Sequence, residues 1–280
     1  MAGAGLTHAA WLERVPELLA ERRDAWSLRL GEPYAAGRAG YVVRAELDDG
    51  TPAVLKLVYP HREAEHEAAA LEAWAGNGAV RLLARSDDGW AMLLERCEPG
   101  TRICDALEGE DALDVMVELL PRLWRPATQP FRTLAEEAAW WVDCLPRDWE
   151  RLGRPLDRAL LDAAIDALGE LAPTQGAQVL LHQDLHGENV LAARREPWLA
   201  IDPKPLIGER EFAASPVIRS FELGAGKTGL VRRLDRLTAE LGLDRDRVRG
   251  WALGQTLAWA LDDAYVDRHA AIARWLLEAS

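Results

Sequence analysis

The segment from His182 to Leu191 constrains this chain more than any other, because it concentrates polar side chains between short apolar runs. The spacing from Asp184 to Asn189 is five residues, and a further apolar run downstream ends at Asp202. Loops that follow strands commonly carry functional groups on a rigid scaffold, so these three side chains are expected to point into one cleft. Their carboxylate and carbonyl oxygens are hard ligands that suit Mg²⁺.

The same segment allows a second interpretation, since His182, Asp184 and His186 alternate along the chain. Alternate residues share one face of a strand, and imidazole together with carboxylate suits a transition metal. This interpretation gives Asn189 and Asp202 no role. A histidine beside a buried turn is also more often a hydrogen-bonded structural residue than a metal ligand.

Hydrophobic patterning predicts a β-rich first part. Apolar residues at helical spacing indicate a helix over residues 7–29, with Thr7 able to cap it, and a second helix over 61–75. Short β-like runs at 41–47 and 52–58 flank the turn Asp48-Asp49-Gly50, which suits a hairpin. Two further strands are expected at 80–85 and 90–95.

After Glu98-Pro99-Gly100 the pattern becomes mainly helical. Helices are expected at 111–124, 134–152 with a break near Pro146, and 156–171, followed by short strands at 179–182, 190–192 and 198–201 and two long helical stretches from Val217 onward. The predicted fold class is α+β with two lobes, a small β-rich lobe over residues 1–96 and a larger helical lobe over 97–280.

Composition limits the kinds of ligand and partner that this protein is expected to bind. The net charge of −13 disfavours nucleic acid and suits a cationic ligand, although an acidic surface can also serve solubility alone. Cys97, Cys104 and Cys144 lack metal or disulfide spacing, so we expect reduced thiols. No run is long and apolar enough to cross a bilayer, and residues 1–12 lack a basic segment followed by a long apolar one. We therefore expect a cytoplasmic protein that binds no membrane, and we expect a monomer because no heptad seam stands out.

Lysine is scarce, since the 33 basic residues other than histidine include only Lys56, Lys204 and Lys227. A lysine retained in so arginine-rich a chain indicates chemistry that needs an ammonium group.

The spacing of Asp184, Asn189 and Asp202 resembles the catalytic segment and metal-binding aspartate of the protein-kinase-like fold. The resemblance implies that Asp184 accepts the proton of a substrate hydroxyl and that Asn189 and Asp202 hold Mg²⁺. Lys56, in the run Ala-Val-Leu-Lys-Leu, corresponds to the lysine that holds the α- and β-phosphates. Glu67 is the expected ion-pair partner of Lys56, with Glu63 and Glu72 as competitors on the same helix.

Two other stretches fit this resemblance. Residues 30–41 contain several glycines and would form the turn that covers the nucleotide. Glu95 and Cys97 lie where the kinase lobes are joined, and backbone groups there would bind adenine. The implied cofactors are ATP and Mg²⁺, with GTP left open as the nucleotide.

The segment 182–191, paired with residues 201–209, resembles the aminoglycoside and hydroxyurea phosphotransferases, especially the streptomycin 6-kinases. The resemblance implies phosphorylation of a hydroxyl on a hydrophilic antibiotic such as a streptomycin-like aminoglycoside. A cationic peptide of the capreomycin/viomycin type would also suit the acidic surface. Lys204 fits the family pattern near the transferred phosphate. Gln183 stands where relatives usually have glycine, and residues 211–214 lack an expected aspartate.

Asp262 and Asp263 are the acids most expected to contact a cationic substrate, beside Trp259. Most tryptophans are expected in the core, although Trp140 and Trp141, with Asp143, could also frame a cationic substrate. Two alternatives remain, namely a metabolic kinase for an amino alcohol or sugar, and a catalytically silent binding protein with the same fold.

Overall fold

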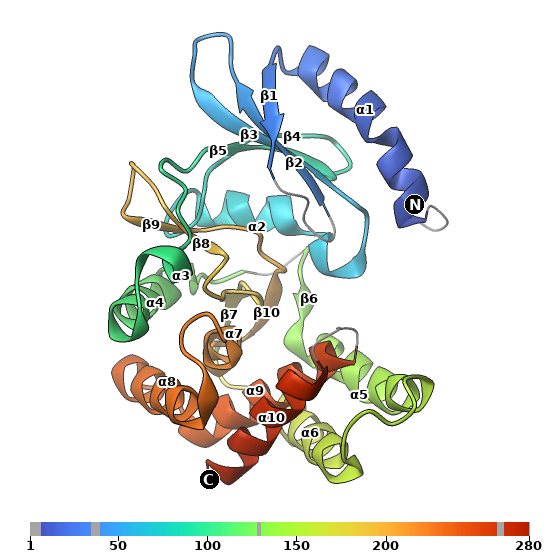
Figure 1. Cartoon of the computed structure of the whole chain (residues 1–280), viewed down its shortest axis with the longest axis vertical. Coiled ribbons are helices and arrows are strands. Elements are labelled where there is room, and N and C mark those ends of the chain that lie inside the picture. The colour runs from blue at the N-terminus through green and yellow to red at the C-terminus, as the bar shows by residue number, and fades with distance from the viewer. Residues whose placement is uncertain (1–6, 35–39, 128–129, 262–265, 280) are drawn as a thin grey trace. The chain divides into compact units, whose positions relative to one another are not determined.

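The structure, a computed structural model, describes residues 7–34, 40–127, 130–261 and 266–279, and the chain divides into two compact units (Figure 1). Unit 1 holds the residues up to Thr101 together with Leu191–Lys204. Unit 2 holds Arg102–Val190 and the residues from Pro205 onward. The segment that follows Asn189 therefore returns to unit 1.

An antiparallel sheet forms the centre of unit 1, with strand order β1-β2-β3-β5-β4 in the described part of the chain. Its strands are β1 (Arg29–Pro33), β2 (Gly40–Glu46), β3 (Pro52–Val58), β4 (Leu82–Arg85) and β5 (Ala91–Glu95). The predicted β2–β3 hairpin is confirmed. Gly50 in its turn has a φ of 84°, which glycine adopts without steric cost.

Helix α1 (His8–Ala25) lies alongside this sheet (Figure 1). The Thr7 hydroxyl accepts a hydrogen bond from the Ala10 backbone N–H at 3.2 Å, as the sequence predicted for the N-cap. Trp11 and Val15 on its inner face belong to a buried cluster with Leu55 and Leu57 of β3. This apolar contact fixes the strand that carries Lys56.

The predicted helix over 61–75 is wrong in its extent, because a 3₁₀ turn (Arg62–Ala64) precedes the shorter α2 (Glu67–Trp74). The hairpin of β8 (Val190–Ala192) and β9 (Trp198–Ala200) is tied to the rest of unit 1 by backbone hydrogen bonds. Val80 N–H donates to the Ala200 carbonyl at 3.0 Å, and Ala200 N–H donates to the Gly78 carbonyl at 2.9 Å. These bonds set the start of the loop that carries Asp202.

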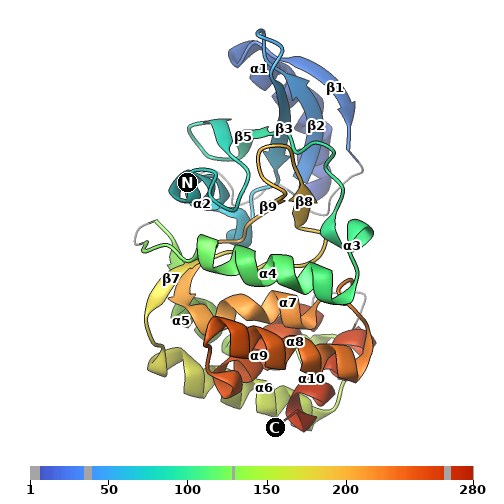
Figure 2. The same ribbon diagram turned by 90° about the vertical axis from the view of Figure 1, so that its left-hand side faces the viewer.

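Unit 2 is mainly helical, with α9 in contact with α6, α7 and α10 (Figure 2). Its helices are α3 (Ile103–Ala106), α4 (Gly109–Leu123), α5 (Leu134–Arg151), α6 (Arg158–Leu171), α7 (Ser215–Arg219), α8 (Gly226–Leu241), α9 (Arg245–Ala260) and α10 (Val266–Glu278). A small sheet joins β6 (Arg132–Thr133), β10 (Leu206–Glu209) and β7 (Gln178–Leu181). Among the described residues after Val217, the long helices are α8, α9 and α10, where two long helical stretches were predicted.

The predicted break near Pro146 is wrong, because α5 continues through this proline to Arg151. Proline in a helix interior costs about 3 kcal/mol, since it removes one hydrogen bond and crowds the preceding turn. Leu145 and Trp149 are both buried on the inner face of α5. Their burial outweighs the local preference of Pro146.

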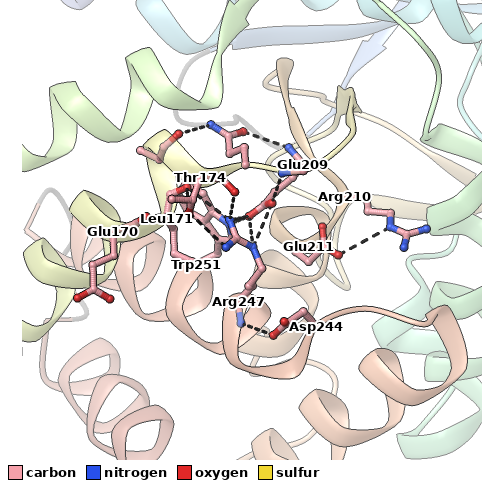
Figure 3. A network of polar contacts seen from close by, with 12 residues as sticks. Glu170, Leu171, Thr174, Glu209, Arg210, Glu211, Asp244, Arg247 and Trp251 are labelled. Atoms are coloured by element: carbon pink, nitrogen blue, oxygen red, sulfur yellow. Dashed lines mark hydrogen bonds and ion pairs between the residues drawn. The ribbon is translucent and has the colours of Figure 1, made fainter.

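Glu209 at the end of β10 anchors the small sheet to α9 (Figure 3). Its carboxylate is 1 % exposed and accepts hydrogen bonds from the guanidinium of Arg247 at 2.8 Å, the indole N–H of Trp251, and Gly176 N–H at 2.9 Å. Each donor compensates part of the cost of burying the charge. Phe212 packs edge-on against Trp251, with ring centroids 5.6 Å apart.

The α+β fold class predicted from the sequence is confirmed. In the described ranges of the chain, no helix combines the length and apolarity that a membrane span requires.

Candidate active site

Lys56 lies in the middle of β3 and points its ammonium group at two carboxylates of unit 1. Its Nζ is 2.5 Å from Glu67 Oε1, and it also donates to Asp202 Oδ1. The side chains of Lys56 and Glu67 are 10 % and 2 % exposed, whereas that of Asp202 is 46 % exposed. The structure thus brings together three residues selected from the sequence, and it places Glu67, rather than its competitor Glu72, on the ammonium group.

The electrostatics of this cluster follow from burial. Burial raises the pKa of Glu67 to about 7, and Lys56 opposes this shift. Burial acts to lower the pKa of Lys56, but the carboxylates of Asp202 and Glu67 outweigh it and the pKa is raised. Lys56 therefore stays cationic at neutral pH, which suits it to bind phosphate oxygens.

Asp202 follows β9 with a φ of 58°, in the left-handed region that non-glycine residues seldom occupy. Such a conformation is found where the surrounding structure aims a side chain at a particular place. Lys204, two residues later, is half-buried and close enough to lower the pKa of Glu67. The structure places Lys204 in the same unit as Lys56 and Asp202.

Glu95, at the end of β5, has a side chain committed to the structure of unit 1. Arg195 donates to both of its carboxylate oxygens, at 2.8 and 2.9 Å, and also to the carbonyls of Gly76 and Ala79. Arg195 belongs to no motif in the sequence and lies 100 residues from Glu95, so only the folded structure reveals this contact. Any contact of Glu95 with a nucleotide would therefore use its backbone carbonyl, because its backbone N–H donates to the Arg81 carbonyl at 2.9 Å.

Cys97 is partly buried just after β5. Burial raises the pKa of its thiol to about 12, with Glu95 adding to the shift. Its backbone N–H and carbonyl form no backbone hydrogen bond within the described part of the chain. Unpaired backbone groups at this position are suited to bind a planar base.

In unit 2, the buried Asp184 lies at the centre of a polar network. Asn189 Nδ2 donates to the backbone carbonyl of Asp184 at 2.9 Å, which closes the loop between them. Asp184 Oδ1 lies 3.4 Å from a guanidinium nitrogen of Arg219 and 3.7 Å from His186 Nε2. His182 Nδ1 accepts the Asp184 backbone N–H at 3.3 Å, so it has the structural role expected for a histidine beside a buried turn.

Arg219 and Glu222 also belong to this network, although no motif in the sequence marks them. Glu222 lies 3.1 Å from His186 Nδ1 and accepts a hydrogen bond from the Ser220 hydroxyl at 2.7 Å. Burial acts to raise the pKa of Glu222, but the contacts with His186 and Ser220 outweigh burial and lower this pKa to about 2. Glu222 is therefore a permanent anion at neutral pH.

Gln183 has a φ of 64°, which explains why glycine would fit this position. Its side chain is buried, and its amide has no hydrogen-bond partner among the residues described. Gln255 of α9, also buried, donates to the Gln183 carbonyl at 2.8 Å. This bond supports the backbone directly before Asp184.

The residues expected to hold Mg²⁺ have suitable chemistry. The Asn189 amide nitrogen is committed to the Asp184 carbonyl, so its Oδ1 is the atom available as a ligand. Asp202 offers a partly exposed carboxylate. The histidine alternative is not supported, because the described residues within ligand reach of one another are His186, Glu188 and Glu222, without His182.

Asp262 and Asp263 lie outside the described residues. Trp141 is fully buried, as expected, whereas Trp140 is 44 % exposed. The indole of Trp259 lies under the guanidinium of Arg219.

Comparison with known proteins agrees with these motifs. The aminoglycoside/hydroxyurea antibiotic resistance kinase family matches residues 26–266. A streptomycin 6-kinase of Streptomyces griseus is 39 % identical over 91 % of this chain and 85 % of its own length. A hydroxyurea phosphotransferase of Kitasatospora aureofaciens is 39 % identical over 98 % of this chain and 82 % of its own.

The solved structure of a thermostable mutant of aminoglycoside phosphotransferase APH(4)-Ia, a ternary complex with ADP and hygromycin B, has a similar fold. Its TM-score is 0.65 at 13 % identity, over 95 % of this chain and 97 % of that one. With the family match spanning most of the sequence, the chain belongs to the aminoglycoside/hydroxyurea antibiotic resistance kinase family and is an ATP-dependent phosphotransferase, as its motifs predict.

Proposed function

We propose that this kinase inactivates a hydrophilic antibiotic by transferring the γ-phosphoryl group of ATP to one of its hydroxyl groups. The observation that carries the proposal is the buried Lys56 held between Glu67 and the more exposed Asp202. A cation fixed beside a potential metal ligand is suited to bind a metal-bound polyphosphate. The acidic net charge of −13 favours a substrate that carries positive charge overall.

In this proposal Asp184 accepts the hydroxyl proton as the acceptor oxygen forms a bond to the γ-phosphorus. The bond between that phosphorus and the bridging oxygen of ADP breaks, so the products are a phosphate ester and ADP. Asn189 and Asp202 would hold Mg²⁺, which neutralises phosphate charge when bound. Lys56 would bind the α- and β-phosphates, Glu67 would position Lys56, and Lys204 would lie near the transferred phosphate. The backbone at Glu95 and Cys97 would bind the base of ATP, or of GTP.

Mass spectrometry of acceptors incubated with enzyme and Mg-ATP tests this proposal. The panel contains streptomycin, capreomycin, viomycin, hydroxyurea and small amino alcohols. A gain of one phosphoryl group on an antibiotic supports the proposal, whereas a gain on an amino alcohol alone identifies a metabolic kinase. Asp184→Asn should abolish transfer while binding of Mg-ATP is retained, and full activity of this variant would exclude Asp184 as the proton acceptor.

A further inference from the structure

Arg219, the last residue of α7, is placed against Asp184 by two contacts within unit 2. One of its guanidinium nitrogens lies 3.4 Å from Asp184 Oδ1, and its guanidinium carbon lies 4.3 Å from the centre of the Trp259 ring. The side chains of Arg219 and Asp184 are only 12 % and 8 % exposed. An arginine stacked on an indole and paired with a carboxylate has little freedom to move away.

The backbone around Arg219 is held from α8. Arg233, itself buried, donates to the carbonyl of Ile218 at 2.8 and 3.1 Å and to the carbonyls of Leu223 and Gly224 at 3.1 and 2.7 Å. These acceptors flank the segment that carries Arg219 on both sides. The position of Arg219 is therefore fixed by the backbone as well as by its own side chain.

His186 approaches the same carboxylate oxygen. Its Nε2 lies 3.7 Å from Asp184 Oδ1, while its Nδ1 lies 3.1 Å from Glu222. Arg219 donates to this oxygen at 3.4 Å, whereas His186 lies beyond hydrogen-bond distance, so Arg219 is the closer cation to the Asp184 carboxylate. If Asp184 accepts the acceptor proton, as the proposed function states, the reacting hydroxyl must dock beside a guanidinium group.

That guanidinium is charged at every accessible pH. In a largely buried site the repulsion between two cations is screened far less than in water. A positive group next to the reacting hydroxyl would therefore meet Arg219 at close range. Positive charge on a part of the substrate remote from that hydroxyl would not approach Arg219.

We propose that Arg219 is a further active-site residue, which orients the carboxylate of Asp184 and selects acceptors that are neutral or anionic beside the reacting hydroxyl. The inference rests on the proposed function, and it narrows the substrate class. A polycationic antibiotic would have to present a hydroxyl from a part of the molecule without a neighbouring cation.

The test compares hydroxyurea, which is neutral, with streptomycin, whose guanidinium groups lie on the same ring as several of its hydroxyls, as acceptors for the wild type, Arg219→Gln and Arg219→Lys. The readout is the ratio of kcat/KM for hydroxyurea to kcat/KM for streptomycin. In Arg219→Gln this ratio should fall about tenfold or more, because one repulsive charge is lost. Arg219→Lys keeps the charge and should keep the ratio within about threefold of wild type. A merely structural role would lower both kcat/KM values equally.

Arg158→Gln is the matched control. Arg158 also lies over an indole, that of Trp149 at 5.5 Å, and pairs with a carboxylate, that of Asp162 at 2.7 Å, but it is 59 % exposed. Its replacement should change neither the ratio nor the rates. Thermal unfolding of each variant verifies that the fold is intact.

A second readout needs no acceptor, because water can take the place of the hydroxyl in slow hydrolysis of Mg-ATP. Arg219→Gln should lower kcat of hydrolysis about tenfold at an unchanged KM for Mg-ATP. If the wild type phosphorylates neither acceptor, the substrate assignment fails, and hydrolysis alone decides the role of Arg219. A folded Arg219→Gln enzyme with an unchanged ratio of kcat/KM values overturns the proposal. If neither acceptor is phosphorylated, an unchanged rate of hydrolysis in this variant overturns it.

Discussion

Lys56 and Glu67 form a buried ion pair, with Lys56 Nζ 2.5 Å from Glu67 Oε1. The same ammonium group donates to Asp202, which is far more exposed. One ammonium group is thus shared between the buried carboxylate of Glu67 and the more exposed carboxylate of Asp202. Glu67 therefore limits how strongly Lys56 holds Asp202.

Replacing Glu67 with glutamine should raise the KM for Mg-ATP about tenfold, which corresponds to about 1.4 kcal/mol. The amide no longer competes for the ammonium group, so Lys56 pairs more tightly with Asp202 and both are less available to the nucleotide. Steady-state kinetics with varied Mg-ATP measure the effect. Glu72→Gln is the control, because Glu72 lies on the same helix but forms a surface ion pair with Arg85. Equal KM values for the two variants would contradict this explanation.

Local signals predicted most of the strands and helices. The β2–β3 hairpin followed from Asp48-Asp49-Gly50, and α1 from its apolar spacing and Thr7. By contrast, β1 was missed because Leu30-Gly31-Glu32-Pro33 has low strand propensity, and only pairing with β2 makes it a strand. The predicted break at Pro146 was wrong for the opposite reason. Proline disfavours a helix interior, but the burial of one face of α5 outweighed this local preference.

The same division applies to the candidate site. Asp184, Asn189 and Asp202 could be selected because fixed spacing brings them into one pattern. Arg219 carries no such signal, because it lies 35 residues from Asp184 and only the packing of α7 brings it there. Gln255 is further away still, 72 residues from the carbonyl that it supports. Contacts of this kind depend on tertiary structure and have no periodicity to detect.

Replacing Gln183 with glycine should stabilise the protein by about 1 kcal/mol. Its left-handed backbone costs about 1 kcal/mol for a residue with a Cβ, and a buried amide without a partner costs about 1–3 kcal/mol. Loss of its buried methylene groups offsets part of the gain. Gln183→Ala keeps the backbone cost and should gain about 1 kcal/mol less. Urea unfolding measures both, and a glycine variant less stable than wild type would show that the side chain is needed.

Glu222 should make stability depend on pH in the acid range. Its folded pKa of about 2 is below the usual value, so its stabilisation is complete above about pH 4.5 and is lost as the pH falls toward 2. The loss should amount to about 2 kcal/mol, reduced somewhat by the partial exposure of the side chain. Urea unfolding at pH 6 and pH 3 should show a smaller difference for Glu222→Gln than for wild type. If the free energy of unfolding changes equally between pH 6 and pH 3 in the two proteins, His186 and Ser220 do not stabilise this carboxylate.

Arg233 should contribute more to stability than Arg236, although Arg236 has more carboxylate partners. Arg236 pairs with Glu110, Asp114 and Glu240, but pairs near the surface contribute about 1 kcal/mol or less. Arg233 instead bonds three backbone carbonyls around the segment that carries Arg219, and burial lowers its pKa only to about 10, so it remains charged at neutral pH.

Arg233→Met would leave those carbonyls without donors, at a cost of about 3 kcal/mol in the free energy of unfolding. Arg236→Met, three residues further along α8, should cost about 1 kcal/mol. Urea unfolding ranks the two variants, and hydrogen exchange should show faster exchange over residues 218–224 in Arg233→Met alone. If Arg236→Met proves the more destabilising change, surface ion pairs rather than bonds to buried carbonyls hold α8 in place.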